Sequence, residues 1–429
     1  MKKADLSGTS ERYFRRFAFR PPQSKNQPHP DTRLIIVIPC HDEPDLLSTL
    51  NSLHHCEAPA YPLEVILVIN SSDLAEAEVK RRNLKTYKEV EAWRELTQPF
   101  FKLQIIHVDD LPPKHAGVGL ARKIGMDEAL HRFACIGYPG LIVCLDADCT
   151  VAPNYLRELE QTVLKYQPQS CCIHFEHEIA ALEDHSLRQG ILHYELHLRY
   201  YVNALAYAGF PFAMHTIGSS MAVRADVYAL SGGMNRRKAG EDFYFLHKVV
   251  PLGGFHHLTK TLVFPSARVS HRVPFGTGKA QADWLLKKEG SGLTYHPQIF
   301  EDLKQFMEVS PLFFGVEETR IKKILSQLPD SVQYFLNKNQ FLDLLAEMRR
   351  HSAGKDSFRK RFFSWFDGFK ALKFAHSSRD CYYNNVATEE GASRMLSLLT
   401  NESCKTGNTD KLLAAYRRLD ISRRHINII

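Results

Sequence analysis

The sequence predicts an α/β fold, with a mixed, mainly parallel sheet flanked by helices and a mainly helical region after it. Fully apolar runs such as residues 34–39 and 141–145 are typical of strands that a parallel sheet buries on both faces. These runs alternate with helical patterns over about 120 residues, as they do in sheets built from βαβ units. With 429 residues, 44% of them hydrophobic and 24% charged, the chain is long enough for such a core and for further domains.

Strands and helices are predicted in alternation from residue 34 onward. We expect strands at 34–39, 63–69, 103–108, 141–145 and 171–175, and a small-residue strand within 216–224. We expect helices at 45–53, 74–96 and 119–133, a helix that opens near 151–155, and an aromatic-rich helix at 185–207. A ligand of such a sheet is expected at the carboxyl ends of its strands.

Three regions are predicted along the chain: a basic N-terminal extension at 1–30, the α/β domain at 31–290, and a helical accessory domain at 291–429. The last includes helical stretches at 341–348 and 411–419. Residues 1–30 hold seven Lys/Arg against two Asp/Glu, and residues 341–429 hold sixteen against ten. The net charge of +7 therefore comes from the two ends, which could contact an anionic membrane or an acidic partner. For the N-terminus, a solvated surface segment that packs its aromatic residues locally is the favoured interpretation.

The composition indicates a soluble protein. No apolar stretch approaches the roughly 20 residues that span a bilayer, and the N-terminus has no hydrophobic segment of secretory type. We therefore expect a cytoplasmic protein, with a possible place at the inner face of the membrane and no nucleic-acid partner. The nine cysteines show no regular spacing and are expected to be reduced thiols.

The most informative motif is Asp146-Ala147-Asp148, directly after the apolar run at 141–145. Two carboxylates one residue apart at a strand end can hold a divalent cation and a diphosphate at the mouth of a parallel sheet. The alternative is an ordinary turn, in which Asp-x-Asp also occurs.

Two later segments add charged side chains. The segment from Gly117 to Arg122 lacks the third glycine of a dinucleotide-binding fingerprint. Lys114, His115 and Arg122 can nevertheless point cations at phosphates. The alternative is a glycine turn with surface cations.

Glu241 and Asp242 enter a predicted helix and offer carboxylates beside a cleft. The alternative is that they merely cap that helix. His193 and His197 are spaced for one helical face but have no third ligand for zinc.

Taken in order, these motifs resemble the family 2 glycosyltransferases of GT-A fold over about residues 33–275. The resemblance rests on Ile38 to Glu43, the Gly-x-Gly-x-Ala-Arg segment, Leu145 to Asp148, Gly218 to Ser220 with Gly232-Gly233, Glu241-Asp242, and Ser270-His271-Arg272. It implies that 31–290 is a GT-A domain that transfers a sugar, of hexosyl type, from a nucleotide-sugar donor to an acceptor hydroxyl with inversion. It also implies one addition per acceptor, because the Gln-x-x-Arg-Trp motif and membrane helices of processive synthases are missing.

The resemblance also assigns roles to residues. Asp242 matches the general base, and Glu241 its acidic neighbour that contacts or orients the acceptor. Donor binding falls to Pro39, His41, Glu43, Asn70, Lys114, Arg122 and Asp146. Asp146, Asp148 and His271 are the implied ligands of Mn²⁺ or Mg²⁺, with the histidine tilting the choice toward Mn²⁺.

Several points stay open at the level of sequence. UDP is favoured over GDP as the nucleotide of the donor. Asp73 is an alternative to Asn70 as the residue that recognises the nucleotide base. The acceptor is a glycan, a lipid-linked glycan or a small molecule, as in cell-surface polysaccharide biosynthesis. A nucleotidyltransferase acting on a sugar phosphate and a non-catalytic sugar-nucleotide-binding or scaffold protein are the alternatives. The first would carry a glycine-rich loop after the first strand, where this chain has Cys40 to Pro44.

Overall fold

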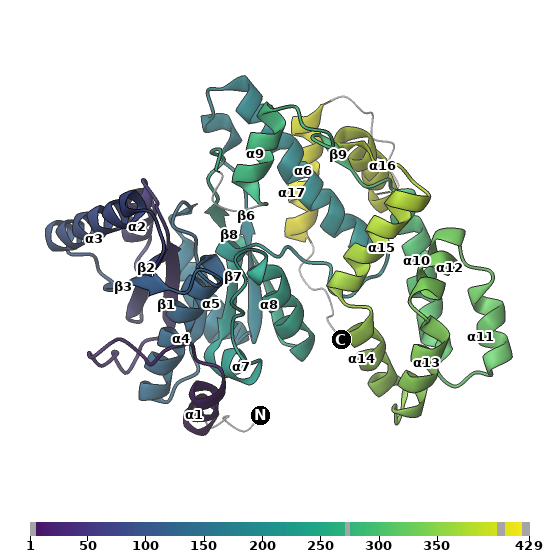
Figure 1. The fold of residues 1–429 in the computed structure, drawn as a ribbon, viewed down its shortest axis with the longest axis horizontal. Helices are drawn as coiled ribbons and strands as arrows, with labels where there is room; N and C mark the ends of the chain where they lie inside the picture. The colour runs from purple at the N-terminus through teal and green to yellow at the C-terminus, as the bar shows by residue number, and fades with distance from the viewer. Residues whose placement is uncertain (1–5, 271–274, 401–407, 423–429) are drawn as a thin grey trace. The chain divides into compact units, whose positions relative to one another are not determined.

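An eight-stranded sheet forms the centre of the first of two units in the computed structural model, which describes residues 6–270, 275–400 and 408–422 (Figure 1). The strand order is β3 (Lys102–Leu111), β2 (Leu63–Ser72), β1 (Leu34–Cys40), β4 (Leu141–Cys144), β7 (Met221–Arg224), β6 (Ser170–Phe175), β8 (Phe255–Phe264) and β5 (Thr150–Val151). The first four strands run parallel, whereas β7 is antiparallel to both β4 and β6. Strand β8 is parallel to β6, and β5 is antiparallel to β8. With the helical region described below, this confirms the predicted fold class.

The central strands form where the sequence is fully apolar. All seven residues of β1 and all four of β4 are buried, and Val37 pairs with Ile66 on one side and Cys144 on the other. Helix α4 (Val118–Ile136) packs on β1 and β2 so closely that a Cβ on Gly125 would lie 2.4 Å from Val37 Cγ1. The predicted strands and helices up to residue 175 are all present, with ends shifted by a few residues.

The remaining helices of the first unit flank this sheet. They are α1 (Leu6–Arg16), α2 (Leu46–His54), α3 (Ala77–Thr97), α5 (Tyr155–Tyr166), α7 (Ala225–Leu230), α8 (Glu241–Val249) and α9 (Thr277–Leu285), with 3-10 turns η1 (Ile179–Ala181), η2 (Gly218–Ser220) and η3 (Val250–Leu252). The unit comprises Met1–Glu183 and Thr216–Ala282, so its boundary falls within α9.

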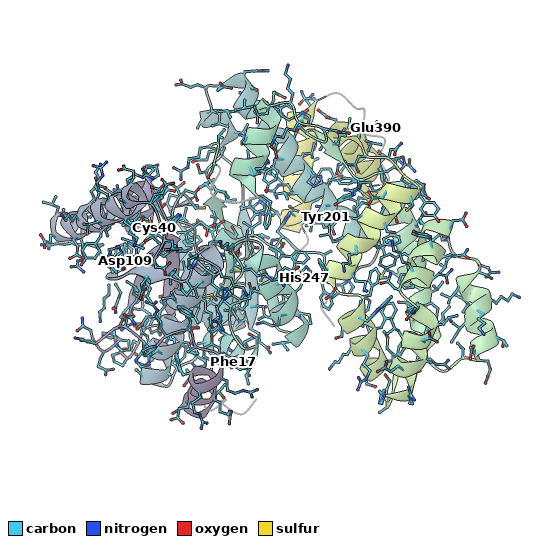
Figure 2. The ribbon with its side chains drawn as sticks, in the orientation of Figure 1. Phe17, Cys40, Asp109, Tyr201, His247 and Glu390 are labelled. Atoms are coloured by element: carbon cyan, nitrogen blue, oxygen red, sulfur yellow. The ribbon has the colours of Figure 1, made fainter. Side chains whose placement is uncertain are left out.

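Helix α1 belongs to the first unit, although its residues fall in the predicted basic extension. It packs against α4 and α7, and its last turn precedes Phe17, which is labelled in Figure 2. Tyr13 is 1% exposed, and its hydroxyl donates to Asp127 Oδ1 of α4 at 2.5 Å. Tyr228 of α7 donates to the same oxygen at 2.6 Å. The aromatic residues of this segment are therefore used for internal packing.

The second unit, Asp184–His215 and Asp283–Ile429, is mainly helical. Its elements are α6 (His185–Tyr207), β9 (Leu293–Thr294), α10 (Gln298–Val309), η4 (Ser310–Phe313), α11 (Glu318–Leu325), α12 (Asp330–Lys338), α13 (Phe341–Arg350), α14 (Lys355–Trp365), α15 (Gly368–Cys381), β10 (Val386–Ala387), α16 (Thr388–Thr400) and α17 (Thr409–Ser422). Buried aromatic rings, including Phe306, Phe341, Phe362 and Phe366, fill its core. No helix among the described residues is long and apolar enough to cross a membrane.

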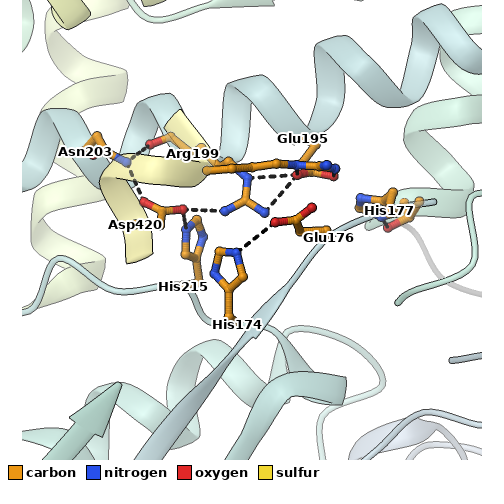
Figure 3. A network of polar contacts seen from close by, with 10 residues as sticks. His174, Glu176, His177, Glu195, Arg199, Asn203, His215 and Asp420 are labelled. Atoms are coloured by element: carbon orange, nitrogen blue, oxygen red, sulfur yellow. Dashed lines mark hydrogen bonds and ion pairs between the residues drawn. The ribbon is translucent and has the colours of Figure 1, made fainter. Parts of the chain in front are cut away.

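The two units divide the chain differently from the predicted ranges, since residues 184–215 group with the C-terminal helices. Helix α6 packs against α16 and α17. A buried polar cluster on these elements, shown in Figure 3, explains why. Asp420 of α17 forms an ion pair with Arg199, accepts a hydrogen bond from Asn203 at 2.8 Å and lies 2.9 Å from His215 Nε2. Each of these partners is buried, so the cluster fixes α17 on α6.

The charge of Asp420 is stabilised by this cluster. Burial alone would raise its pKa, but the charges of His215 and Arg199 and the amide of Asn203 outweigh that effect and lower the pKa of Asp420. A carboxyl group whose folded pKa lies below its unfolded pKa contributes stability above the unfolded value. That contribution is lost as the pH falls toward the folded pKa.

We expect Asp420→Asn to lower the free energy of unfolding at pH 7 by about 3 kcal/mol, because it leaves Arg199 with one buried counter-charge fewer. The difference from the wild-type protein should shrink as the pH falls below about 4, because the unfolded wild-type chain then binds a proton at this carboxyl group while the folded protein, with its lowered pKa, still holds it ionised. Chemical denaturation at both pH values measures this. Asp410→Asn, on the same helix but 57% exposed, is the matched control and should change little. Equal effects of the two variants would contradict the role of the cluster.

Candidate functional site

The Asp-Ala-Asp motif lies in the turn that follows β4. Leu145 N–H still donates to Val37 O of β1 at 3.1 Å, and the chain then leaves the sheet. Thr49 of α2 donates its hydroxyl to Ala147 O at 2.9 Å, and Cys149 N–H donates to Asp146 O at 3.2 Å. These bonds fix the turn while the side chains of Asp146 and Asp148 stay 35% and 29% exposed. The motif therefore presents two accessible carboxylates at the carboxyl end of the sheet, as predicted.

Arg122 links this turn to the Glu241–Asp242 pair. It lies in the first turns of α4 and is 1% exposed. Its Nη2 donates to Asp146 and its Nη1 donates to Glu241, which is 119 residues away in sequence. Burial opposes the charged form of Arg122, but the carboxylates of Asp146 and Glu241 outweigh this and raise its pKa. One buried guanidinium thus brings two of the predicted motifs together.

Two glycines make room for this contact. A Cβ on Gly218 would lie 2.6 Å from Arg122 Nη1, and a Cβ on Gly119 would lie 2.3 Å from Arg237 O and 3.0 Å from Glu241 Cβ. Any side chain at either position would displace the guanidinium or the segment before α8. Gly218 and Gly119 are therefore needed because they lack a side chain, which lets Arg122 and the segment before α8 come close to the backbone.

Glu241 and Asp242 begin helix α8 after Gly240, which has φ +69° and is the residue that precedes the helix. Glu241 is buried, whereas Asp242 is partly exposed and accepts a hydrogen bond from Phe243 N–H at 2.7 Å. Neither residue occupies the capping position. The pair does not cap the helix; instead, Glu241 is bonded to Arg122.

Burial raises the pKa of both acids. For Glu241 it outweighs the opposing charge of Arg122 and, with the negative charges of Asp242 and Asp146, raises the pKa to about 7. Burial also raises the pKa of Asp242, although Arg122 and hydrogen bonds from the backbone of Phe243 and Gly218 oppose it. A carboxylate with a raised pKa is a stronger base, which suits proton abstraction near neutral pH.

A second arginine, which the sequence did not single out, joins the first strand to the Asp-Ala-Asp turn. Arg268 Nη2 contacts Glu43, which is 3% exposed, and lies 3.6 Å from Asp148 Oδ2. The segment that carries Arg268 is held by Gln281, whose amide donates to Ala267 O at 2.9 Å. Arg268 escaped prediction because nothing in its local sequence indicates a partner more than a hundred residues away.

The predicted donor-binding residues after β1 and β2 also converge. Cys40, labelled in Figure 2, marks the end of β1, and Pro39 is buried within the strand and pairs with Val68. His41 is exposed, and its Nδ1 lies 2.8 Å from Asn70 O at the end of β2. Asn70 is 2% exposed, and its Oδ1 has no hydrogen-bond partner among the described residues.

Two predicted residues stand apart from this group. Lys114 is exposed in the turn between β3 and α4, and within the described ranges it makes no ion pair. His271, the predicted third metal ligand, lies outside the described residues.

Asp146 and Asp148 fit a divalent cation in ligand type. Both are partly exposed carboxylates at one turn, and Mg²⁺ and Mn²⁺ take carboxylate, water and phosphate oxygens. Both also already face a guanidinium, Arg122 for Asp146 and Arg268 for Asp148, so their negative charge is in part compensated. The described residues contain no group of three metal-ligating side chains.

Residues 35–228 match a family model described as glycosyl transferase family 2. No curated protein matches the sequence. The matched range includes β1, the Asp-Ala-Asp turn and Arg122, and it ends before Glu241 and Asp242.

Solved structures give weaker similarities. The chain is 14% identical to S. aureus TarS 1–349 in complex with UDP-GlcNAc, with a TM-score of 0.39 over 91% of this chain and 89% of that chain. It is 13% identical to GalNAc-T7 with UDP, GalNAc and Mn²⁺, with a TM-score of 0.36 over 72% of this chain and 57% of that chain.

We expect Gly218→Ala to lower the free energy of unfolding by about 1–3 kcal/mol, because the new methyl group would overlap the Arg122 guanidinium. Gly354→Ala is the matched control, since Gly354 has an extended backbone and no atom lies within 4 Å of the position that its methyl group would take. Thermal and chemical denaturation of both variants measure the effect. A Gly218→Ala protein as stable as the control would contradict the close approach.

Proposed function

Residues 35–228 match the model of glycosyl transferase family 2, and from this match we propose that the protein is an inverting glycosyltransferase of that family. It transfers one sugar from a nucleotide-sugar donor, with UDP favoured over GDP, to an acceptor hydroxyl. The observation that carries the proposal is the Arg122 bridge, because it brings the Asp146 turn and the Glu241–Asp242 pair into one site. A donor and an acceptor could meet there.

Asp242 is the proposed general base. As the acceptor hydroxyl attacks the anomeric carbon, its proton passes to an oxygen of Asp242. The carboxylate is partly exposed, and the N–H of Phe243 holds it in place at the start of α8. Its pKa, raised by burial, makes it a better proton acceptor than a solvated aspartate. Attack from the face opposite the departing diphosphate gives inversion.

Glu241 is proposed as a positioning residue. Its carboxylate is buried and bonded to Arg122, so it is poorly placed to abstract a proton from a substrate. Through Arg122 it ties the start of α8 to the Asp146 turn, and it thereby sets where Asp242 lies. This refines the sequence-based role, in which Glu241 contacts or orients the acceptor.

Asp146 and Asp148 are the proposed holders of Mn²⁺ or Mg²⁺ at the donor diphosphate. Such a cation, when bound, stabilises the negative charge of the leaving diphosphate. The chain's own contribution is to keep the two carboxylates accessible at one turn, beside the guanidinium groups of Arg122 and Arg268. Asn70 Oδ1, buried at the end of β2, is a candidate acceptor for an N–H of the nucleotide base.

The segment after β1 favours glycosyl transfer over nucleotidyl transfer. Asp42 adopts φ +50° and binds Arg82 of α3, with Arg82 Nη2 2.7 Å from Asp42 Oδ2. Asp42 N–H also donates to Asn83 Oδ1 at 3.0 Å. This segment is held by side chains and has no glycine-rich loop to wrap a triphosphate. A non-catalytic scaffold would have no use for a partly exposed carboxylate with a raised pKa.

Incubation with a panel of nucleotide sugars and Mn²⁺ distinguishes these functions. A glycosyltransferase releases UDP or GDP, a nucleotidyltransferase forms or consumes pyrophosphate, and a scaffold produces neither. Free nucleotide released in proportion to the glycosylated product or hydrolysed sugar supports the proposal. Pyrophosphate chemistry would refute it.

We expect Asp242→Asn to reduce turnover by about 10²–10⁴-fold, because the carboxamide cannot accept the acceptor proton. Binding of the donor, measured by thermal shift with a nucleotide sugar and Mn²⁺, should stay close to that of the wild-type protein. Asp110→Asn, which changes a 70% exposed aspartate of the same unit, is the control and should keep full activity. If Asp242→Asn keeps wild-type turnover, its assignment as the base is wrong.

Asp146→Asn and Asp148→Asn test the metal site directly. We expect either change to weaken Mn²⁺ binding by at least tenfold, because each removes a charged oxygen ligand. Titration of Mn²⁺ followed by its paramagnetic resonance measures this without a substrate. The thermal stabilisation by UDP with Mn²⁺ should fall in parallel, while Asp110→Asn keeps both. Unchanged Mn²⁺ affinity in both variants would place the metal elsewhere.

A further inference from the structure

The most basic segment of the second unit extends from residue 349 to residue 373. It contains eight basic residues, namely Arg349, Arg350, Lys355, Arg359, Lys360, Arg361, Lys370 and Lys373, against two acids, Asp356 and Asp367. These residues lie at the end of α13, on α14 and on the first turns of α15. Helices α13 and α14 contact each other and lie side by side in Figure 1.

The basic side chains of α14 point away from the core. Phe358 and Phe362 anchor the helix and are 3% and 1% exposed, whereas Lys355, Arg359 and Lys360 are exposed. None of these three cations makes an ion pair or hydrogen bond with any residue that the structure describes. Their charges are therefore available to an external partner.

The turn between α13 and α14 is held in place by two further arginines. Arg361 Nε donates to His351 O at 2.9 Å, and Arg349 donates to Val316 O before α11. The first bond ties α14 to the end of α13, and the second ties α13 to the segment before α11. We call the exposed side chains of Arg350, Lys355, Arg359 and Lys360 the basic surface.

Exposed apolar groups occur in and near the same basic segment, two of them beside Lys370 and Lys373. Phe369 at the start of α15 is 37% exposed, and Lys373 Nζ lies 4.5 Å from its ring centroid. Trp365 at the end of α14 is partly exposed, with Lys370 Nζ 5.4 Å from its ring. Leu342 of α13 is also 37% exposed. Cations beside exposed aromatic and aliphatic groups are typical of surfaces that lie on a lipid bilayer.

Helix α3 of the first unit shows that cations alone do not make such a surface. It has six Lys/Arg but also four Glu in 21 residues. Arg81 and Glu78 are 2.9 Å apart, and Lys85 lies 3.5 Å from Glu89. Its positive charge is therefore largely compensated by its own acids, in contrast to α14.

We propose that the basic surface binds an anionic phospholipid membrane and holds the enzyme at its cytoplasmic face. Each basic side chain near an anionic bilayer strengthens binding about fivefold, and the effect is screened by salt. The mixture of cations with Phe369 and Trp365 favours a bilayer over a soluble polyanion, which offers no apolar interior. This goes beyond the proposed transferase activity and does not depend on it.

The test uses the full-length protein and sedimentation with vesicles of phosphatidylcholine, alone or with 30% phosphatidylglycerol. We expect binding only to the anionic vesicles and a strong decrease between 50 mM and 300 mM NaCl. The variant Lys355→Gln, Arg359→Gln, Lys360→Gln should weaken binding by about 100-fold, since three basic contacts are lost. Phe369→Ala should also weaken it, which a purely electrostatic contact would not require.

The control variant removes the same number of exposed cations from the first unit: Arg81→Gln, Lys85→Gln, Lys88→Gln. It should bind anionic vesicles like the wild-type protein, and circular dichroism should show that both variants are folded. No binding to anionic vesicles at 50 mM NaCl overturns the proposal. So does an equal loss in both variants, or binding to soluble polyphosphate without binding to vesicles. Nucleotide-sugar turnover in solution is measured separately, so failure here leaves the transferase function intact.

Discussion

The candidate site depends on one buried guanidinium that serves two carboxylates. Asp146, Glu241 and Asp242 come from segments about a hundred residues apart, and as like charges they would repel one another at short range. Arg122 compensates this repulsion, with its two terminal nitrogens on Asp146 and Glu241. Such a bridge is costly to bury and strongly directional, so it constrains geometry more than it adds stability. The place where a donor and an acceptor could meet is set by this contact.

Helix α4, which carries Arg122, connects the site to the rest of the first unit through its other charges. It is buried on nearly all sides, so each of its ionic groups needs a partner from another segment. Arg132 pairs with Glu64 of β2, and Glu128 accepts a hydrogen bond from Gln23 N–H at 2.6 Å. Asp127 accepts from Tyr13 of α1. The helix therefore fixes the sheet, the N-terminal segment and the start of α8 relative to one another.

Sequence reasoning succeeded where the information is local. Apolar runs predicted β1 and β4, and the order of short motifs predicted that the Asp146 turn and the Glu241–Asp242 pair lie close together, as the contacts of Arg122 with Asp146 and Glu241 show. It gave no indication of distant partners: it did not predict that Arg122 is bonded to Asp146 and Glu241, while the contact of Arg122 with the donor's phosphates stays a prediction. Arg268, which contacts Glu43 and Asp148, was missed altogether. The local sequence around a single arginine does not indicate which carboxylate the arginine will contact after folding. These contacts could therefore be identified only from the structure.

The same distinction applies to the two basic ends of the chain, which composition alone treats as equivalent. In the N-terminal segment, Tyr13 is buried against α4 and α7, and Arg20 lies 3.0 Å from Asp110. That segment is an integral part of the first unit, and its aromatic residues are used in packing. On α14 the phenylalanines are buried and the cations are left exposed without counter-charges among the described residues. A net charge becomes an interaction surface only where the fold leaves it uncompensated, and by that criterion α14 is the better candidate of the two.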